Sequence, residues 1–365
     1  MKQIIPWILR VLIGIAIAFL VAGAVMLVRG EHQRIMPMIS GAMLCVALAS
    51  GGFARSRNWA FLIWLSSAIA IGMTFPAWFI GVGDFKFTRL FIPLLQLIMF
   101  CMGTTLGIAD FARVVRMPGG VAAGIICQFT IMPFLGYGLA KLSGFPPEIG
   151  AGIILVGSVP SGLASTVMVF LARADVALSV TLTAMTSLLA PLITPFMMQW
   201  LAGEMVQIDA GKLMWDLTKM TVIPVLAGLA WHHWMQHRAR WLSRVMPYFS
   251  MAGIIAMTLL TIAVGRDNLL RLGVMLIVIC FLHSTAGYFL GYLVCRGLRM
   301  NKATCRTIAF EVGMQNAGMA SAVAASLNKV ATLGLAPIVF GPVMNLTAST
   351  LANWWRAHPI NGKQD

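Results

Sequence analysis

Charged residues are scarce in this chain, and acidic residues are the scarcest of them. Only 10% of its 365 residues are charged, with 11 Asp and Glu against 26 Lys and Arg, whereas soluble domains average about 25%. This excludes an ordinary globular enzyme. The chain is instead rich in apolar residues, which make up 59% of it and recur in runs long enough to cross a bilayer. The sequence therefore predicts an all-α polytopic membrane protein.

Several functional signatures are also missing. The six cysteines are scattered without a CxxC pair, which argues against a disulfide framework and a zinc site. The basic residues, which give a formal charge of +15, lie in short loops between apolar runs, so they indicate membrane orientation and not nucleic acid binding. His233 and His237 have the spacing of a helical metal site, but no carboxylate or cysteine joins them. No metal other than an alkali cation is expected.

Charge, glycine and proline clusters divide the apolar sequence into about twelve predicted membrane spans. With the N-terminus in the cytoplasm, 16 basic residues fall on the inner side and 10 on the outer side. The positive-inside bias therefore places both termini in the cytoplasm, and the compact loops suggest a bacterial inner membrane. An Ala22-Gly-Ala24 pattern resembles a signal cleavage site, but the apolar run continues, so a retained helical hairpin is expected. The predicted spans are 7–28, 35–53, 59–80, 89–109, 118–140, 149–171, 177–201, 213–231, 247–265, 272–295, 304–328 and 331–355.

An internal repeat relates the two halves of the chain. The segment from Ser161 to Leu171 matches the segment from Ala317 to Leu327 at a constant offset, and Leu135-Gly-Tyr137 is echoed by Leu290-Gly-Tyr292. The offset spans five predicted helices, and an odd number places the second copy upside down in the membrane. Inverted five-helix repeats are a common plan of secondary transporters.

The matching helix of each repeat contains residues that interrupt a helix. Proline removes a helical hydrogen bond and glycine relaxes the backbone, and unpaired backbone groups at membrane depth are tolerated where they bind a ligand or line water. A proline kink packed against its neighbours is the simpler alternative. The two stretches are Gly157-Ser-Val-Pro160-Ser-Gly162 and Glu311-Val-Gly313-Met-Gln315-Asn316-Ala-Gly318.

Glu311 is the one acidic residue that the predicted spans place well inside the membrane. A charge there costs at least about 2.5–3.5 kcal/mol on insertion scales, so it should be paired, protonated or bound to a cation. Arg306, five residues upstream, offers a structural ion pair as one alternative. Coordination of an alkali cation fits the surrounding oxygen-bearing side chains better. These are Gln128, Ser165, Thr166, Ser179, Thr183, Gln315 and Asn316.

Three segments of the sequence are similar to a known family: Ser158-Val-Pro160 to Ser165-Thr166, Ala190-Pro to Pro195, and Glu311-Val-Gly-Met-Gln315-Asn316. These segments carry a resemblance to the bile acid:sodium symporter family that extends over residues 90 to 357. The resemblance implies two inverted five-helix repeats, which form a panel domain and a core domain with two crossed broken helices. It implies sodium-driven uptake of an organic anion by alternating access.

The resemblance also assigns residues to two sodium sites and divides the chain into parts. The expected parts are an extra N-terminal helical hairpin (1–57), a first repeat (58–202), a second repeat (210–357) and a cytoplasmic tail (358–365). Substrate or crossover candidates are Pro160, Gly162, Asn316, His283 and Asn345. Site one would use Ser165, Thr166, Ser179, Thr183 and Glu311, and site two would use Gln128, Glu311, Gln315 and the carbonyls of Val312 and Met314.

Two positions depart from the family pattern. Thr166 stands where bacterial members have Asn, which puts the affinity or ion preference of site one in question. Leu282-His283-Ser284 stands where Leu-His-Asn is common, so His283 is interpreted as a structural hydrogen-bond partner or, alternatively, as a substrate or proton residue.

The leading hypothesis is a sodium-coupled symporter of an organic anion, either bile-acid-like or a small carboxylate such as pantoate. Alternatives are a proton-coupled or efflux carrier of the same fold and a non-transporting membrane sensor or assembly protein. An intramembrane hydrolase acting through Glu311 and His283 is disfavoured, because no second carboxylate at mid-membrane depth shares the acid and base roles. The expected partners are two sodium ions, the organic anion and the lipid bilayer, while the oligomeric state is left open.

Overall fold

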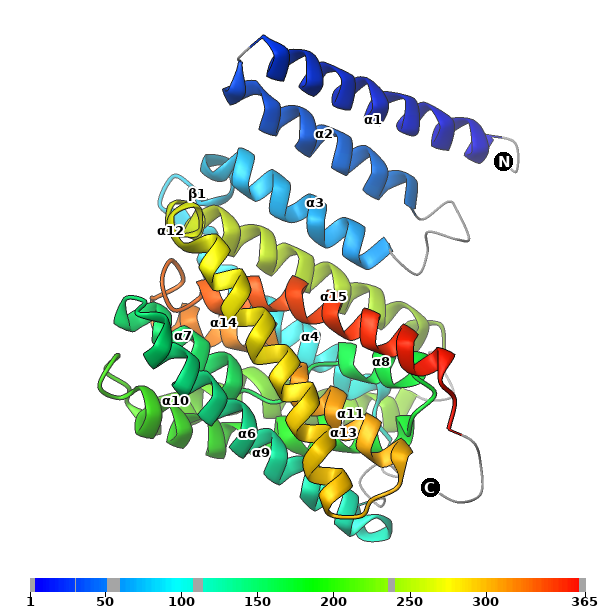
Figure 1. Ribbon diagram of the computed structural model, residues 1–365, viewed down its shortest axis with the longest axis vertical. Helices are drawn as coiled ribbons and strands as arrows, with labels where there is room; N and C mark the ends of the chain where they lie inside the picture. Colours follow the sequence, from blue (N-terminus) through cyan, green and yellow to red (C-terminus); the bar gives the residue numbers. More distant parts are fainter. Residues whose placement is uncertain (1–3, 30, 51–59, 108–113, 236–239, 361–365) are drawn as a thin grey trace.

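The computed structural model describes residues 4–29, 31–50, 60–107, 114–235 and 240–360, and most of them are helical (Figure 1). A helix satisfies all of its backbone hydrogen bonds internally, which a chain in lipid requires. The short segments are η1 (Pro76–Phe79), β1 (Gly81–Val82), β2 (Phe85–Lys86), η2 (Phe87–Leu90) and the π-helical turn η3 (Thr218–Val222). The helices are α1 (Ile4–Val28), α2 (His32–Ser50), α3 (Ala60–Thr74), α4 (Phe91–Thr105), α6 (Pro118–Ser143), α7 (Pro147–Ser158), α8 (Ala164–Leu171), α9 (Val176–Ala202), α10 (Ala210–Leu217), α11 (Ile223–Met235), α12 (Arg240–Gly297), α13 (Lys302–Gly313), α14 (Ala317–Ser326) and α15 (Leu335–Ala357).

Seven helical segments of the described residues are long and apolar enough to cross a membrane, judged by length and composition. The protein is thus a multi-pass membrane protein, as the sequence predicts. The predicted number of twelve spans is not reproduced by this measure. Predicted spans 149–171 and 304–328 are each divided into two short helices, and α2 and α3 contain shorter apolar stretches.

The predicted spans 247–265 and 272–295 both lie in α12, which has 58 residues. A straight helix of that length would extend for about 87 Å, nearly three times the apolar thickness of a bilayer. Figure 1 shows that α12 instead bends sharply and runs back as a second arm. Two side chains near this bend hold other elements: Arg266 Nε donates to the Met73 carbonyl at 2.8 Å, and Asn268 Nδ2 donates to the Ala331 carbonyl at 2.7 Å.

Two helices are broken where the sequence predicts it. The first break separates α7 from α8 at residues 159–163, and the second separates α13 from α14 at residues 314–316. The two breaks, here called the crossing, contact each other directly. Ser161 pairs with Gln315 in an antiparallel bridge, and the Asn316 N–H donates to the Pro160 carbonyl at 2.8 Å. Each break therefore satisfies backbone groups of the other.

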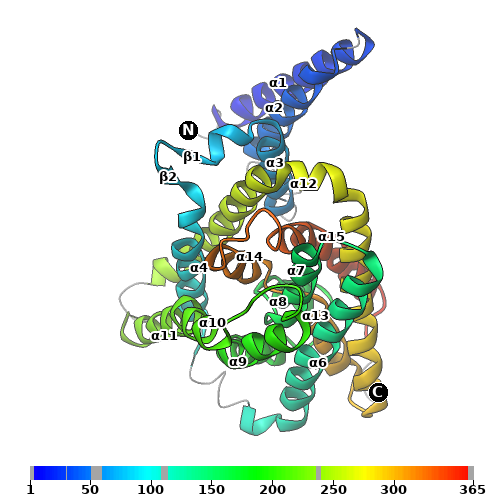
Figure 2. The same ribbon diagram turned by 90° about the vertical axis from the view of Figure 1, so that its left-hand side faces the viewer.

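The crossing lies in the interior of the helical assembly. Figure 2 shows α8, α13 and α14 surrounded by longer helices, while α1 and α2 lie outside them. The N-terminal helices form successive layers, with α1 against α2 and α2 against α3. Ser40 of α2 links the last two layers, because its hydroxyl donates to the Ala70 carbonyl at 3.0 Å and lies 2.6 Å from the Thr74 hydroxyl.

Candidate functional site

Glu311 lies in the last turn of α13, immediately before the second break, and only 2% of it is exposed. Four hydroxyl groups donate to its carboxylate, two to each oxygen. Ser165 and Ser179 donate to Oε1, each at 2.6 Å. Thr183 donates to Oε2 at 2.9 Å, and Ser161 donates to the same oxygen. The carboxylate is thus surrounded by oxygen atoms that retain lone pairs.

The four hydroxyls come from the first broken helix and from α9. Ser161 lies in the first break, and Ser165 lies in the first turn of α8. Ser179 and Thr183 are one helical turn apart on α9, so both point from the same face. Thr166 does not join the carboxylate directly, but its hydroxyl lies 3.0 Å from that of Ser179. It therefore adds an oxygen next to the cluster.

Arg306 does not neutralise Glu311, so the alternative of a structural ion pair is wrong. Its guanidinium donates to the carbonyls of Trp355 at 3.2 Å and His358 at 2.7 Å, and it lies over the Trp355 ring. These carbonyls are at the C-terminal end of α15, where a cation is favoured. Within the described ranges, no Lys, Arg or His forms a salt bridge with Glu311. A buried carboxylate without a cationic partner needs a bound cation or a proton.

A second polar cluster lies at the second break and involves Gln128 and Gln315. Gln128 of α6 donates through Nε2 to the Gln315 side-chain oxygen at 2.7 Å and to the Val159 carbonyl at 2.9 Å. Gln315 in turn donates to the Val312 carbonyl at 2.5 Å. All of these groups are buried. One side chain of α6 is thereby connected to both breaks, and Met314 lies in the second break next to Gln315.

The remaining predicted residues fall into two groups. Pro160, Gly162 and Asn316 lie at the crossing: the Gly162 carbonyl lies 2.8 Å from the Ser165 hydroxyl, and Asn316 caps α14 by accepting from the Met319 N–H at 3.0 Å. His283 and Asn345 make their hydrogen bonds elsewhere. His283 Nε2 donates to the Met132 carbonyl at 3.0 Å, and Asn345 Nδ2 donates to the Gly341 carbonyl of its own helix at 2.9 Å.

The placement of His283 fits the structural interpretation, because its ring also packs edge-on against Phe340. Of the histidines near the end of α11, His232 lies 2.7 Å through Nδ1 from the Thr104 carbonyl, whereas His237 lies outside the described residues.

Sequence reasoning missed two residues at the crossing. Ser161, which donates to Glu311, lies inside the glycine and proline motif but was not separated from it as a candidate. Ser284, next to His283, donates to the Gly313 carbonyl at 3.1 Å at the end of α13. The signal for Ser161 was a hydroxyl in a helix break, where the chain leaves the helical geometry that lets a serine bond the carbonyl one turn before it.

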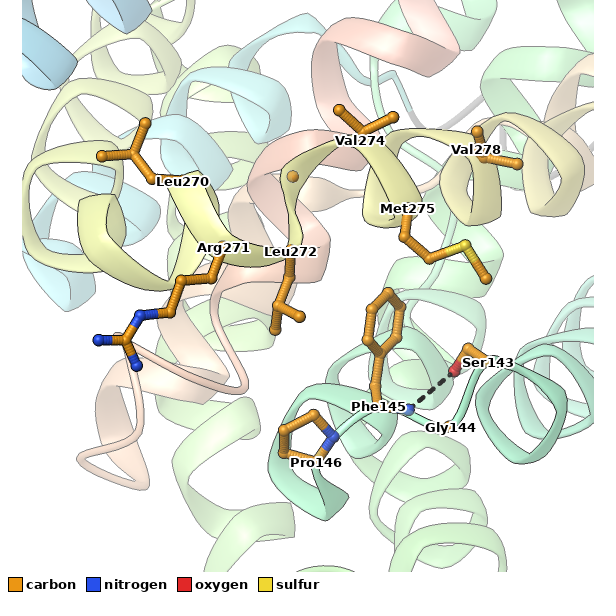
Figure 3. A pocket seen from close by; sticks show the side chains of 11 residues that line it. Ser143, Gly144, Phe145, Pro146, Leu270, Arg271, Leu272, Val274, Met275 and Val278 are labelled. Carbon is orange, nitrogen blue, oxygen red and sulfur yellow. Dashed lines mark hydrogen bonds between the residues drawn. The ribbon is translucent and has the colours of Figure 1, made fainter.

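A separate groove of about 530 Å³ lies between the loop after α6 and the second arm of α12 (Figure 3). Figure 3 shows Phe145 and Met275 facing each other across it, with Arg271 at one end. Its lining is mostly apolar, and Val274 and Leu270 are well exposed, which suits contact with lipid. None of its lining residues belongs to the predicted sites: Ser143, Gly144, Phe145, Pro146, Leu270, Arg271, Leu272, Gly273, Val274, Met275 and Val278.

Comparisons with known proteins identify the family that this chain resembles in sequence. The family model described as "Sodium Bile acid symporter family" matches residues 92–273. The "Uncharacterized sodium-dependent transporter YocS" of Bacillus subtilis (strain 168) is 36% identical over 296 residues, which are 81% of this chain and 90% of that protein. The "Probable sodium/metabolite cotransporter BASS1, chloroplastic" of Oryza sativa subsp. japonica is 32% identical over 310 residues, covering 83% and 74% of the two chains.

The same-named protein of Arabidopsis thaliana is also 32% identical, over 298 residues that cover 81% of this chain and 73% of that protein. The range matched by the family model begins after α3 and includes Gln128, the first break and both hydroxyls of α9, whereas Glu311 and Gln315 lie beyond it.

Proposed function

Because the chain belongs to the sodium bile acid symporter family, we propose that it is a sodium-coupled symporter of an organic anion. The observation that carries the proposal is the environment of Glu311. This buried carboxylate accepts four hydroxyl hydrogen bonds next to the crossing and has no cationic partner among the described side chains. A small hard cation with oxygen ligands supplies the missing charge.

Sodium site one comprises Glu311 and the hydroxyls around it. A hydroxyl that donates its hydrogen to the carboxylate still has lone pairs for a cation, so the network is compatible with a bound ion. Thr166 supplies a hydroxyl that lies 3.0 Å from that of Ser179. In this proposal it contributes a hydroxyl oxygen to the edge of the site. Its proposed ligands are Ser165, Thr166, Ser179, Thr183 and Glu311.

Sodium site two lies at the second break. In this proposal, Glu311 and four further oxygens bind the ion. They are the side-chain oxygens of Gln128 and Gln315 and the backbone carbonyls of Val312 and Met314. The Val312 carbonyl now accepts a hydrogen bond from Gln315, and a sodium ion at this place would substitute for that hydrogen bond. Both sites then share the carboxylate of Glu311. Binding of an ion at one site therefore changes the affinity of the other site for its ion, because both ions interact with the same charge.

The anionic substrate is proposed to bind beside the crossing. Helices α8 and α14 both begin there, and the N-terminus of a helix has partial positive charge that favours a carboxylate or sulfate. In this proposal, the anion lies next to three residues of the crossing, Pro160, Gly162 and Asn316. The substrate class is a bile-acid-like anion or a small carboxylate such as pantoate.

The transport cycle is proposed to follow from an inverted repeat. The first repeat covers 58–202 and the second 210–357, and each contributes one broken helix. The offset of the matching segments in the sequence supports this division. Movement of a core, which carries the two breaks, against a panel would expose the crossing to the two sides of the membrane in turn. The hairpin in 1–57 and the cytoplasmic tail in 358–365 are additions to this plan, with both termini in the cytoplasm.

The test is the melting temperature of the purified protein during a NaCl titration, with KCl holding the ionic strength constant. A ligand that binds only the folded state stabilises it by about 2.7 kcal/mol at a hundred times its Kd. We expect sodium to raise the melting temperature of the wild type and to have no effect on Glu311→Ala. The control is Glu204→Ala, which removes an exposed carboxylate from the protein surface.

Each other outcome favours a different function. A wild-type protein that is insensitive to sodium but carries a pH-dependent flux after reconstitution would support the proton-coupled or efflux alternative. Binding of an organic anion without any flux would support a sensor or assembly protein.

A further inference from the structure

Ser161 occupies an unusual position for a serine in a membrane protein. Only 1% of it is exposed, and it lies in the first break between the end of α7 and the start of α8. A serine inside a helix commonly bonds the carbonyl one turn before it, as Ser158 does with Ile154 at 2.8 Å. The Ser161 hydroxyl instead donates to Glu311 Oε2 and lies 3.4 Å from the Thr183 hydroxyl.

The backbone around Ser161 is held by the other break. Ser161 pairs with Gln315 in the bridge, and the carbonyl of the preceding Pro160 accepts from the Asn316 N–H. The position of the hydroxyl is therefore set by both broken helices together. Its side chain contacts Glu311 and Thr183 of proposed site one, and its backbone pairs with Gln315 of proposed site two.

We propose that Ser161 is a further sodium ligand at Glu311, a role that rests on the proposed function. Its hydroxyl oxygen, Glu311 Oε2 and the Thr183 hydroxyl form a compact group of three oxygens. Such a group suits an alkali cation, and the hydroxyl that now donates to the carboxylate offers its lone pairs to the ion. Because the backbone of Ser161 pairs with Gln315, sodium binding by Ser161 also stabilises the contact between the two breaks.

This assignment gives the proposed ion a hydroxyl partner at each oxygen of Glu311. Ser165 and Ser179 donate to Oε1, whereas Ser161 and Thr183 donate to Oε2. Thr166 contacts Ser179 and not the carboxylate. Ser161 therefore adds a second hydroxyl, beside that of Thr183, on the Oε2 side of the site.

The test compares the sodium midpoints of Ser161 variants in the thermal titration described above. Ser161→Ala removes the ligand oxygen, and we expect its sodium midpoint to rise about tenfold or more. Ser161→Thr keeps a hydroxyl and is expected to stay within about threefold of the wild type. The matched control is Ser158→Ala, which lies three residues upstream, is equally buried, and bonds a carbonyl of its own helix. Its midpoint should not change.

A purely structural role would lower the melting temperature without sodium and leave the sodium midpoint unchanged. If Ser161→Ala does not fold, Ser161→Cys decides, because it keeps the approximate shape and replaces the oxygen with sulfur, a poor sodium ligand. A wild-type midpoint in Ser161→Ala or Ser161→Cys overturns the assignment and leaves the proposed function intact. An absence of any sodium response in the wild type overturns both.

Discussion

The crossing connects residues that are far apart in the sequence, whereas the N-terminal hairpin of α1 and α2 connects neighbours. Gln128 and Gln315 are 187 positions apart, and Ser165 and Glu311 are 146 apart. The hairpin is linked to α3 through Ser40 and Ala70, which are 30 apart. Only 17% of the most apolar stretch of α1 is buried, against 67% of that of α15. The crossing is thus a buried junction of polar groups, whereas the hairpin is a pair of apolar helices at the periphery.

The difference lies in where the backbone hydrogen bonds are made. In the hairpin, the helices are continuous and make their backbone hydrogen bonds internally, apart from the one that Pro37 removes from α2, so they need no second break to complete them. At the crossing, two helices give up this self-sufficiency, and each depends on the other break and on polar side chains. Such an arrangement is expected where a ligand benefits from the freed groups. Sodium dependence should therefore change with substitutions at the crossing and not with changes in the hairpin.

The largest effect is expected from adding one methyl group near the crossing. A Cβ at Gly157 would lie 2.3 Å from the Met132 carbonyl oxygen of α6, whereas a Cβ at Gly14 of α1 would meet nothing within 4 Å. Forced overpacking of this kind costs about 1–3 kcal/mol or more. We expect Gly157→Ala to lower the melting temperature by several degrees and Gly14→Ala to leave it unchanged or slightly raised. Equal melting temperatures for the two variants would contradict the comparison.

A second prediction separates stability from sodium binding. Gln128→Leu keeps the approximate volume but leaves the Gln315 oxygen and the Val159 carbonyl without their donor, at a cost of about 1–3 kcal/mol. Ser40→Ala removes the hydrogen bond between α2 and α3, at a cost of about 1 kcal/mol. Both variants should melt at lower temperature. Only Gln128→Leu should raise the sodium midpoint. A similar rise in Ser40→Ala would show that a loss of stability is by itself enough to weaken sodium binding.

A third prediction concerns an ion pair near the broken helices but outside the crossing. Glu148 at the start of α7 accepts hydrogen bonds from Lys329 and, at 2.5 Å, from Thr332, in the loop between α14 and α15. The two charged side chains are 36% and 32% exposed, so solvent screens them. We expect a double-mutant cycle of Glu148→Gln and Lys329→Met to give a coupling of about 1 kcal/mol or less, with no shift in the sodium midpoint. A tenfold shift would extend the sodium network to this edge.

The smallest effect is expected from removing the hairpin. Deletion of residues 1–50 takes away α1 and α2, which are distant from the crossing in both views (Figures 1 and 2). We expect the sodium midpoint of the shortened protein to remain within about twofold of the full chain, since no ligand of the proposed sites is lost. A sodium response that disappears with the hairpin would instead assign it a direct part in coupling.

The helix breaks were predictable because their signal is local. Pro160, Gly162 and Gly313 interrupt apolar runs of membrane length, and a single acidic residue in such a run is conspicuous. The bend of α12 was not predictable in the same way. The sequence separates its two arms by Arg266, Asp267 and Arg271, which was interpreted as a loop, whereas the chain remains helical and is held there by bonds from Arg266 and Asn268.

The sequence by itself determined that this is a helical membrane protein, where two of its helices break, and that Glu311 needs a cationic or protonic counterpart. These properties follow from apolar length, from the backbone chemistry of proline and glycine, and from the cost of a charge in lipid. Only the tertiary structure decided that Arg306 turns to the end of α15, that His283 bonds Met132, and that Ser161 reaches Glu311. Those choices depend on which oxygens and carbonyls of distant helices meet at hydrogen-bonding distance, and no local pattern specifies that.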